Sequence, residues 1–419
     1  MTPKKTYIVG AGLSGLAAAA ALARKNMPVE LLEAAPLAGG RCRSWFDAQF
    51  GEVIDNGNHL VLSGNTSTYT YLRTIGAEDR LQGAAEARFA FCDIRSGRRW
   101  SISPNGSSLP WWVFSPSRRV PDTKARDYLK FAPLLRRNRG KRVGEVIACR
   151  GPLWDRLLQP FLLAALNTAP EEASAELACR VIRETLARGG RYCLPRIATP
   201  SLAAAFVEPA LSFLGRRGAK IRLGERLRAI IFNETAVVAL DFGEFRITVG
   251  NGERVILAVP SWVASALMPD IPVPDHNSAI VNAHYRASAH PDSPTILGII
   301  GGTAEWVFAF PERLSVTVSG ADGIVDRDRA ELAAILWRDV AAAHGLSLQL
   351  PPWQIVKEKR ATFRATPDQD MKRPPARTRW SNFFLAGDWT ASALPATIEG
   401  AIRSGQKAAG LAAGEPTGP

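Results

Sequence analysis

Short apolar runs and a glycine-rich turn alternate at the start of the chain. Residues 6–9 and 29–32 are apolar runs with the length of buried strands, and an alanine-rich stretch between them extends to about Lys25. The intervening residues 10–15 read Gly-Ala-Gly-Leu-Ser-Gly. Short β-rich runs bounded by turn residues predict strands, and the longer alanine-rich stretch predicts a helix. The pattern therefore predicts a strand, a glycine turn, a helix and a second strand that ends at Glu33.

Each part of this pattern suits the binding of a dinucleotide. Gly10 permits a tight turn, Gly12 lets the backbone approach a pyrophosphate, and Gly15 lets the helix lie close to the strand. The N-terminus of the helix offers unpaired N–H groups to phosphates. Glu33 stands 18 residues after Gly15, where a carboxylate accepts hydrogen bonds from ribose hydroxyls. Lys4 and Lys5 before an uncharged stretch also imitate a secretory signal peptide, but dinucleotide binding explains more of the residues.

Further predicted strands lie in the middle and near the end of the chain. Residues 217–230 alternate apolar and polar positions, and residues 255–260 form an apolar run. Residues 382–390 have the pattern of a buried strand followed by a Gly-Asp turn, and a helix is expected to begin near Pro395. The proline-rich residues 269–274 predict a junction between domains.

The composition is that of a globular protein. Of the 419 residues, 46% are hydrophobic and 22% are charged. A single core rarely grows past about 250–300 residues, so we expect two domains. The five cysteines form no CxxC pair, so we expect neither a zinc site nor a disulfide framework, and a reducing compartment fits best. The net charge of +13 predicts an acidic partner, which is nucleic acid, anionic lipid or a phosphorylated ligand.

Much of this charge lies in residues 111–142, which contain ten basic residues and only Asp122 and Asp127 as acids. Aromatic and leucine residues are interleaved, and helical spacing from Thr123 is expected to continue until Pro133. Basic residues with interfacial aromatics favour an anionic membrane surface. A solvated basic face on an ordinary helix is the alternative, and nucleic acid is disfavoured because no recognition fold accompanies the charge. The apolar runs are too short to predict a transmembrane helix.

The residues after the second strand carry a resemblance to a known superfamily. Glu33-Ala34 followed by Gly39-Gly40-Arg41 resembles the FAD-binding start of the amine oxidase, phytoene desaturase and protoporphyrinogen oxidase superfamily. The string Asp55-Asn56-Gly57-Asn58-His59 more closely resembles the hydroxysqualene dehydroxylase family. Further segments with this resemblance are 109–112, 166–168, 360–363, 386–390 and 395–401.

The resemblance implies an α/β fold with FAD as cofactor. A Rossmann-type FAD-binding domain of the amine oxidase/desaturase type would comprise residues 1–85, 206–270 and 376–419. An α+β substrate-binding domain, inserted in segments, would comprise residues 86–205 and 271–375. The residues implied to bind FAD are Gly10, Ala11, Gly12, Leu13, Ser14, Gly15, Glu33, Ala34, Gly39, Gly40, Arg41, Gly57, Asn58, His59, Leu227, Gly387, Asp388, Thr397 and Ile398.

For this family the implied reaction is the reductive dehydroxylation of hydroxysqualene to squalene, as in hopanoid biosynthesis. Carbon exchanges a C–O for a C–H bond, so reduced flavin must deliver a hydride, and a general acid must protonate the leaving hydroxide. His59 is the preferred acid, followed by Asp388 and Asp55. The candidate residues for the substrate pocket are Trp45, Trp111, Trp112, Phe161, Trp389 and Pro395.

Three alternatives remain open at this stage. A phytoene-type desaturase would use oxidised FAD and remove a hydride. A non-catalytic flavin-bearing isoprenoid carrier would share the basic segment and the apolar pocket. An amine oxidase is disfavoured because no acidic site for a cationic amine stands out. For the preferred enzyme we expect an unidentified reductant as a partner, and a cytoplasmic location with peripheral attachment to the inner face of the membrane.

Overall fold

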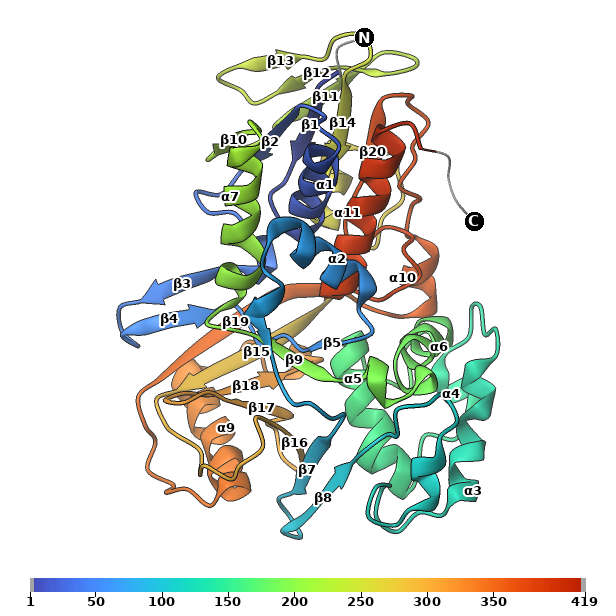
Figure 1. The fold of residues 1–419 in the computed structure, drawn as a ribbon, viewed down its shortest axis with the longest axis vertical. Helices are drawn as coiled ribbons and strands as arrows, with labels where there is room; N and C mark the ends of the chain where they lie inside the picture. The colour runs from blue at the N-terminus through green and yellow to red at the C-terminus, as the bar shows by residue number, and fades with distance from the viewer. Residues whose placement is uncertain (1–3, 416–419) are drawn as a thin grey trace.

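A computed structural model describes residues 4–415, and its first layer is a five-stranded sheet (Figure 1). The strand order is β10-β2-β1-β14-β20, and every neighbouring pair is parallel. The sheet thus collects strands from the start, the middle and the end of the chain. Its strands are β1 (Thr6–Val9), β2 (Val29–Glu33), β10 (Lys220–Leu223), β14 (Arg254–Leu257) and β20 (Phe383–Leu385).

The predicted strand-turn-helix-strand unit is confirmed, since helix α1 (Leu13–Arg24) joins β1 to β2. Helix α11 (Ile398–Ala412) packs directly on α1, and a Cβ atom on Gly405 would come within 2.1 Å of the Ser14 carbonyl oxygen. Helix α2 (Thr66–Ile75) begins beside α11, where the Glu399 carboxylate accepts from the N–H of Thr68 at 2.8 Å. The two ends of the chain therefore form one tightly packed helical layer (Figure 1).

Two predicted boundaries differ from the structure. The run 255–260 is a strand only to Leu257, and the alternating residues 217–230 form two short strands, β10 and β11, separated by a loop. Smaller elements surround this region of the fold. They are the hairpin of β3 (Ser44–Asp47) and β4 (Glu52–Asp55), the sheet of β11 (Ala229–Phe232), β12 (Val237–Asp241) and β13 (Arg246–Thr248), and the helices α7 (Glu208–Arg216) and α8 (Ser261–Leu267).

A second, seven-stranded sheet lies in the lower half of Figure 1. Helix α9 (Arg329–His344) covers one face, where Val281, Leu314 and Leu336 share an apolar cluster. In the order of the sheet its strands are β19 (Trp353–Phe363), β15 (Asn277–Tyr285), β18 (Leu314–Val318), β17 (Trp306–Ala309), β16 (Ile296–Ile300), β7 (Phe89–Asp93) and β8 (Arg98–Ile102).

Alternate residues of a strand point to opposite sides, and the side chains that β15 and β18 direct away from α9 are polar. Asn282 and His284 of β15 are buried there and hydrogen-bond to the backbone carbonyls of Asn56 and Asp55 at 3.2 and 3.1 Å. The segment that follows β4 therefore lies on the second sheet, while β1 and β2 belong to the first. Residues 55–59 are thus placed where the two layers meet.

A group of short helices completes the fold beside the second sheet (Figure 1). Helix α3 ends at Tyr128, and the chain continues as a 3-10 helix, Leu129–Leu135, that contains Pro133. The predicted interruption at Pro133 is therefore wrong: the α-helix stops earlier, because the ring of a proline clashes with the carbonyl group four residues before it. The remaining elements are α3 (Ala125–Tyr128), α4 (Val143–Val146), α5 (Gln159–Leu166), α6 (Ala175–Glu184), α10 (Pro367–Met371), β5 (Val61–Leu62), β6 (Leu81–Gln82) and β9 (Pro195–Ala198).

Among residues 4–415 no helix combines the length and the apolar character needed to cross a bilayer. The two sheets with their helices correspond to the predicted α/β fold class. The limits given above for the FAD-binding and substrate-binding domains remain a prediction.

Candidate functional site

The first glycine turn leaves an open space in front of helix α1. Gly10 has φ +106°, and a Cβ atom there would lie 2.4 Å from the Ala258 carbonyl oxygen; at Gly15 it would lie 1.8 Å from the Gly10 carbonyl oxygen. These two glycines are required by the packing of the protein itself. A Cβ atom on Gly12, by contrast, would meet no atom within 4 Å.

Gly12 is also the N-cap residue of α1, and no side chain caps that helix end. The first N–H groups of a helix have no partner within it and attract anions. The free space and the uncapped donors therefore fit a phosphate-bearing cofactor, as the sequence predicts for Gly10, Ala11, Gly12, Leu13, Ser14 and Gly15.

The second glycine loop lies against the first. The N–H of Gly39 donates to the Ala11 carbonyl oxygen at 2.8 Å, and a Cβ atom on Gly40 would be 3.3 Å from the Gly12 Cα atom. Both residues have positive φ, so L-side chains are disfavoured at this contact. The two loops, which helix α1 and strand β2 separate in the sequence, thus form adjacent walls of the same space.

Glu33 stabilises this arrangement from the end of β2. Its carboxylate accepts from the N–H of Ala11 at 2.6 Å and from the N–H of Ala35 at 2.9 Å. The carboxylate therefore fixes the glycine turn, a contact that the sequence pattern did not indicate. Its predicted hydrogen bonds with ribose hydroxyls remain a prediction, as does the role of the exposed Ala34.

An ion pair connects the second glycine loop with the end of the chain. The Arg41 guanidinium lies 2.7 Å from the Asp388 carboxylate and also donates to the Ala361 carbonyl oxygen. Asp388 is buried and follows strand β20 directly. Because β20 is parallel to β14 in the first sheet, its carboxyl end reaches the same edge as the glycine turn. The sequence prediction that both ends of the chain meet at one site agrees with this geometry.

The loop around Asp388 is fixed by contacts of Gly387, Trp389 and Arg373. Gly387 has φ +153°, and a Cβ atom there would lie 2.3 Å from the Trp389 indole nitrogen. That indole donates to the Val259 carbonyl oxygen at 2.8 Å, so Trp389 is part of the packing of this loop. The buried Arg373 donates to the carbonyl oxygens of Asp388 and Thr390 at 3.1 and 2.6 Å. Arg373 was missed from the sequence, where nothing distinguishes it from the other arginines of this basic chain.

His59 lies close to this ion pair. Burial, together with the nearby Arg41 charge, lowers the pKa of His59 to about 4. The ring nevertheless keeps some accessible surface, although it is deep enough for burial to dominate its pKa. The His59 imidazole is therefore neutral near pH 7 in the cofactor-free protein.

The residues before His59 are held by the polar face of the second sheet. The Asn58 amide donates to the Thr317 hydroxyl at 3.1 Å, and a Cβ atom on Gly57 would be 2.9 Å from the Asn282 amide nitrogen. Asp55 accepts from the Ser44 hydroxyl at 2.5 Å and from the N–H of Leu202 at 2.9 Å. These two hydrogen bonds engage the Asp55 carboxyl group in holding the surrounding chain, and burial raises its pKa.

Three more predicted cofactor residues lie in the loop after β10 and at the start of α11. Leu227 is buried in the loop after β10, and the N–H of Glu225 in this loop donates to the Glu33 carbonyl oxygen at 2.8 Å. Thr397 is the N-cap of α11 and accepts from the N–H of Gly400 at 3.0 Å, and the buried Ile398 begins the helix. Their implied contacts with FAD remain predictions.

The predicted pocket residues lie in different surroundings. Trp112 is buried and packs edge-to-face on Tyr128 with 5.3 Å between ring centroids, whereas Trp111 is 62% exposed. Trp45 on β3 and Phe161 on α5 are half-buried, and Pro395 is buried just before α11. None of these contacts tests substrate binding, so the pocket lining stays a prediction.

Two segments that resemble the family in the sequence meet in the fold. The buried Asn167 side chain donates to the Thr362 hydroxyl at 2.9 Å and accepts from the N–H of Gly320 at 2.6 Å. The Thr168 hydroxyl accepts from the N–H of Ala365 at 2.8 Å. These contacts connect the end of α5 with strand β19, whose Ala361 carbonyl oxygen accepts from Arg41.

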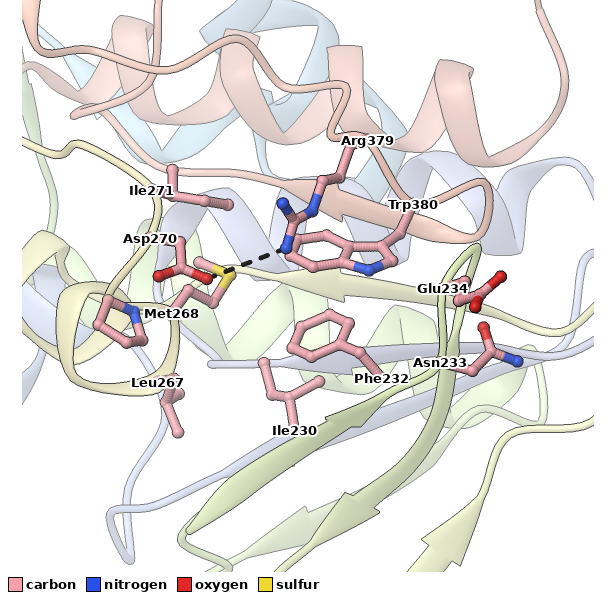
Figure 2. Close-up of a pocket in the computed structure, with 11 residues that line it drawn as sticks. Ile230, Phe232, Asn233, Glu234, Leu267, Met268, Asp270, Ile271, Arg379 and Trp380 are labelled. Carbon is pink, nitrogen blue, oxygen red and sulfur yellow. Dashed lines mark ion pairs between the residues drawn. The ribbon is translucent and has the colours of Figure 1, made fainter.

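A separate pocket of about 290 Å³ lies between β11 and the residues after α8 (Figure 2). Phe232 stacks on Trp380 with 4.0 Å between centroids, and Arg379 forms an ion pair with Asp270 at 3.9 Å. Its lining includes none of the residues predicted for FAD or substrate. We therefore place the candidate site at Arg41 and Asp388.

Comparison with known proteins identifies the family. Residues 13–413 match the model of the flavin containing amine oxidoreductases. The chain is 50% identical to a hydroxysqualene dehydroxylase of Sinorhizobium fredii, over 99% of both chains. It is 51% identical to the enzyme of that name from Rhodopseudomonas palustris, over 97% of this chain and 98% of the relative.

More distant matches support the fold. A solved putrescine oxidase superposes with a TM-score of 0.69 at 18% identity, over 97% of this chain and 98% of that chain. Zeta-carotene and phytoene desaturases are 23 to 24% identical to this chain.

Proposed function

Because the chain belongs to the hydroxysqualene dehydroxylase family of the flavin-containing amine oxidoreductases, we propose that it converts hydroxysqualene into squalene. The observation that carries this proposal is the likeness to two such enzymes over nearly the full length of both chains. The desaturases match far less closely, so the desaturase alternative is not favoured. The enzyme is an FAD-dependent oxidoreductase, and FAD when bound and reduced supplies the hydride.

The residues proposed to hold FAD fit its parts. The uncapped N-terminus of α1 and the space at Gly12 suit the diphosphate, and Arg41 adds a guanidinium fork beside them. Glu33 has lone pairs left for the ribose hydroxyls, since it accepts only two backbone hydrogen bonds among the described residues. Asp388 orients Arg41 through the ion pair and is itself held by the contacts of Arg373 and Trp389 with its loop.

His59 is our proposed general acid. Its side chain makes no hydrogen bond within residues 4–415, so its ring nitrogens are free for a substrate hydroxyl. An acid must first be protonated, and burial, with the Arg41 charge as the smaller cause, opposes protonation of His59 in the cofactor-free protein. A cofactor phosphate beside Arg41 would offset that charge and raise the pKa of His59. Asp388 is committed to Arg41, and Asp55 to Ser44 and Leu202, which favours His59 over both.

We extend the proposal to peripheral attachment to an anionic membrane through residues 111–142. Within or next to this segment Leu109, Trp111, Phe114 and Leu129 are all more than 60% exposed. Exposed apolar side chains among basic residues suit insertion at a lipid interface. A C30 isoprenoid is insoluble in water, so an enzyme at the membrane surface has access to its substrate. The reductant that supplies electrons to FAD is unidentified.

The test of the reaction is a single-turnover experiment without oxygen. Photoreduced enzyme is mixed with detergent-dispersed hydroxysqualene, flavin absorbance is followed, and products are extracted. We expect flavin reoxidation with one squalene formed per flavin. Reoxidation without squalene, or no reoxidation, contradicts the proposed function. If a phytoene-type isoprenoid instead reduces the oxidised flavin of the enzyme, the protein is a desaturase.

A further inference from the structure

A groove of about 610 Å³ lies between the basic segment, residues 111–142, and helix α6. None of the residues that line it is assigned to FAD. One wall consists of residues 136–140, the second is α6, and the third is formed by α10 with residues 391–393. Figure 1 shows where α6 and α10 lie in the fold. Six arginines line it, namely Arg136, Arg137, Arg139, Arg180, Arg183 and Arg373.

The two acids of the groove are already engaged within the protein. Glu176 accepts from the N–H of Asn138 at 3.1 Å and pairs with Arg180 at 3.8 Å. Asp370 pairs with Arg373 at 2.9 Å. Neither carboxylate is therefore available to neutralise the remaining arginines.

Three arginines of the groove have no carboxylate partner within residues 4–415. The exposed side chains of Arg136, Arg137 and Arg139 make no hydrogen bond or ion pair within the part of the chain that the structure describes. Like charges that converge on a concave surface produce a strong positive potential. An anion bound there would gain charge-assisted hydrogen bonds without breaking existing ones, and guanidinium groups match the geometry of phosphate.

Two exposed apolar side chains lie in the groove or next to it along the chain. Met371 lines the groove and is 67% exposed, and Leu135, next to Arg136 in the chain, is also exposed. These two side chains come from segments far apart in the sequence. A soluble phosphate compound would not need these side chains, whereas a phospholipid presents its phosphate next to apolar chains. The combination therefore favours a lipid as the source of the phosphate.

We propose that this groove is a binding site for the phosphate of an anionic phospholipid, with Arg136, Arg137 and Arg139 as its ligands. Met371 and Leu135 then contact the glycerol and acyl region. The inference rests on the proposed membrane attachment. It adds a specific binding site for one lipid headgroup to the general attraction between the basic residues 111–142 and an anionic membrane. The groove volume falls within the usual range for small-molecule sites, about 300–1,000 Å³.

The test compares two charge-matched variants. The groove variant carries Arg136→Gln, Arg137→Gln and Arg139→Gln. The control variant carries Lys124→Gln, Arg126→Gln and Lys130→Gln, which removes three charges from the same basic segment but outside the groove. Both variants must retain the melting temperature of the parent, which shows that they fold.

Binding is measured by calorimetry with dihexanoylphosphatidylglycerol below its micelle concentration. We expect saturable binding to the parent, at least tenfold weaker binding to the groove variant, and a change of less than about threefold in the control. Equal losses in both variants, or no saturation, overturn the site. Inorganic phosphate is the second ligand: if it binds as tightly as the lipid and displaces it fully, the lipid assignment is wrong.

The test of the lipid site does not measure enzyme activity. Squalene formation is measured on the parent with detergent-dispersed substrate, so failure of the proposed function and failure of the lipid site appear in separate experiments.

Discussion

The Arg41 guanidinium lies 2.7 Å from the Asp388 carboxylate, and this ion pair joins residues 347 positions apart in the chain. Arg41 belongs to the glycine loop after β2, and Asp388 follows β20, so the contact closes the site that both ends of the chain form. Asp388 is buried, whereas the Arg41 side chain keeps 38% of its accessible surface. The arginine is therefore oriented by the protein and open to a ligand on its other side.

Replacing this arginine is expected to weaken FAD binding. Arg41→Ala removes the guanidinium and leaves the Asp388 carboxylate buried without its partner. We expect a loss of about 1–3 kcal/mol, or roughly tenfold to hundredfold in the FAD dissociation constant, measured by flavin fluorescence. Arg80→Ala is the control, because Arg80 is exposed, lies outside both glycine loops and pairs with Asp79 only at 4.0 Å. Equal affinity of Arg41→Ala and the parent would contradict the assignment.

Two neighbouring glycines should respond differently to alanine. Gly12→Ala places a methyl group in empty space at an ordinary φ of −72°, so the cofactor-free protein should keep its melting temperature while FAD affinity falls at least tenfold. Gly15→Ala places a methyl group 1.8 Å from the Gly10 carbonyl oxygen, so this variant should lose stability instead. Thermal unfolding and FAD titration of both proteins separate the two effects. A Gly12→Ala variant that binds FAD like the parent would show that no phosphate occupies this space.

The pKa of His59 can be measured directly. In the cofactor-free protein its ring should titrate near pH 4 in a nuclear magnetic resonance experiment, because burial and Arg41 both disfavour the charged form. The folded pKa lies below the unfolded value of about 6.5, so stability is lost as pH falls from 6.5 towards 4. His59→Gln should remove this part of the pH dependence and reduce single-turnover squalene formation by at least about a hundredfold. Unchanged turnover in His59→Gln would exclude the ring as the acid.

Glu305 gives a second prediction on pH. Burial raises the pKa of this carboxyl group to about 8, although it accepts from the N–H of Ser319 at 2.8 Å. The folded pKa lies above the unfolded value, so its contribution is complete below about pH 4.5 and is lost as pH rises to 8. Glu305→Gln should be more stable than the parent at pH 8 to 9, by on the order of 5 kcal/mol at most. Denaturant unfolding of both proteins at pH 5 and pH 9 gives their free energies of unfolding. If the difference between the two proteins is the same at both pH values, the prediction is wrong.

The sequence by itself determined the local units of the nucleotide-binding layer. The turn at residues 10–15, helix α1 and strand β2 follow from glycine conformation and apolar periodicity, both of which act over a few neighbouring residues. The resemblance of residues 33–41 and 55–59 to known motifs identified the family and its cofactor. Element ends were less certain: Pro133 stopped the α-helix at Tyr128, which lies earlier than the local spacing indicated.

Only the tertiary structure decided how these units meet. Strand order placed Asp388 beside Arg41, the polar face of β15 held residues 55–58, and Arg373 fixed the loop after β20. Glu33 likewise proved to hold the N–H of Ala11. None of these contacts is local, and each depends on which buried surfaces and unpaired polar groups remain after the sheets pack. The pKa of His59 has the same origin, because burial and the Arg41 charge exist only in the folded chain.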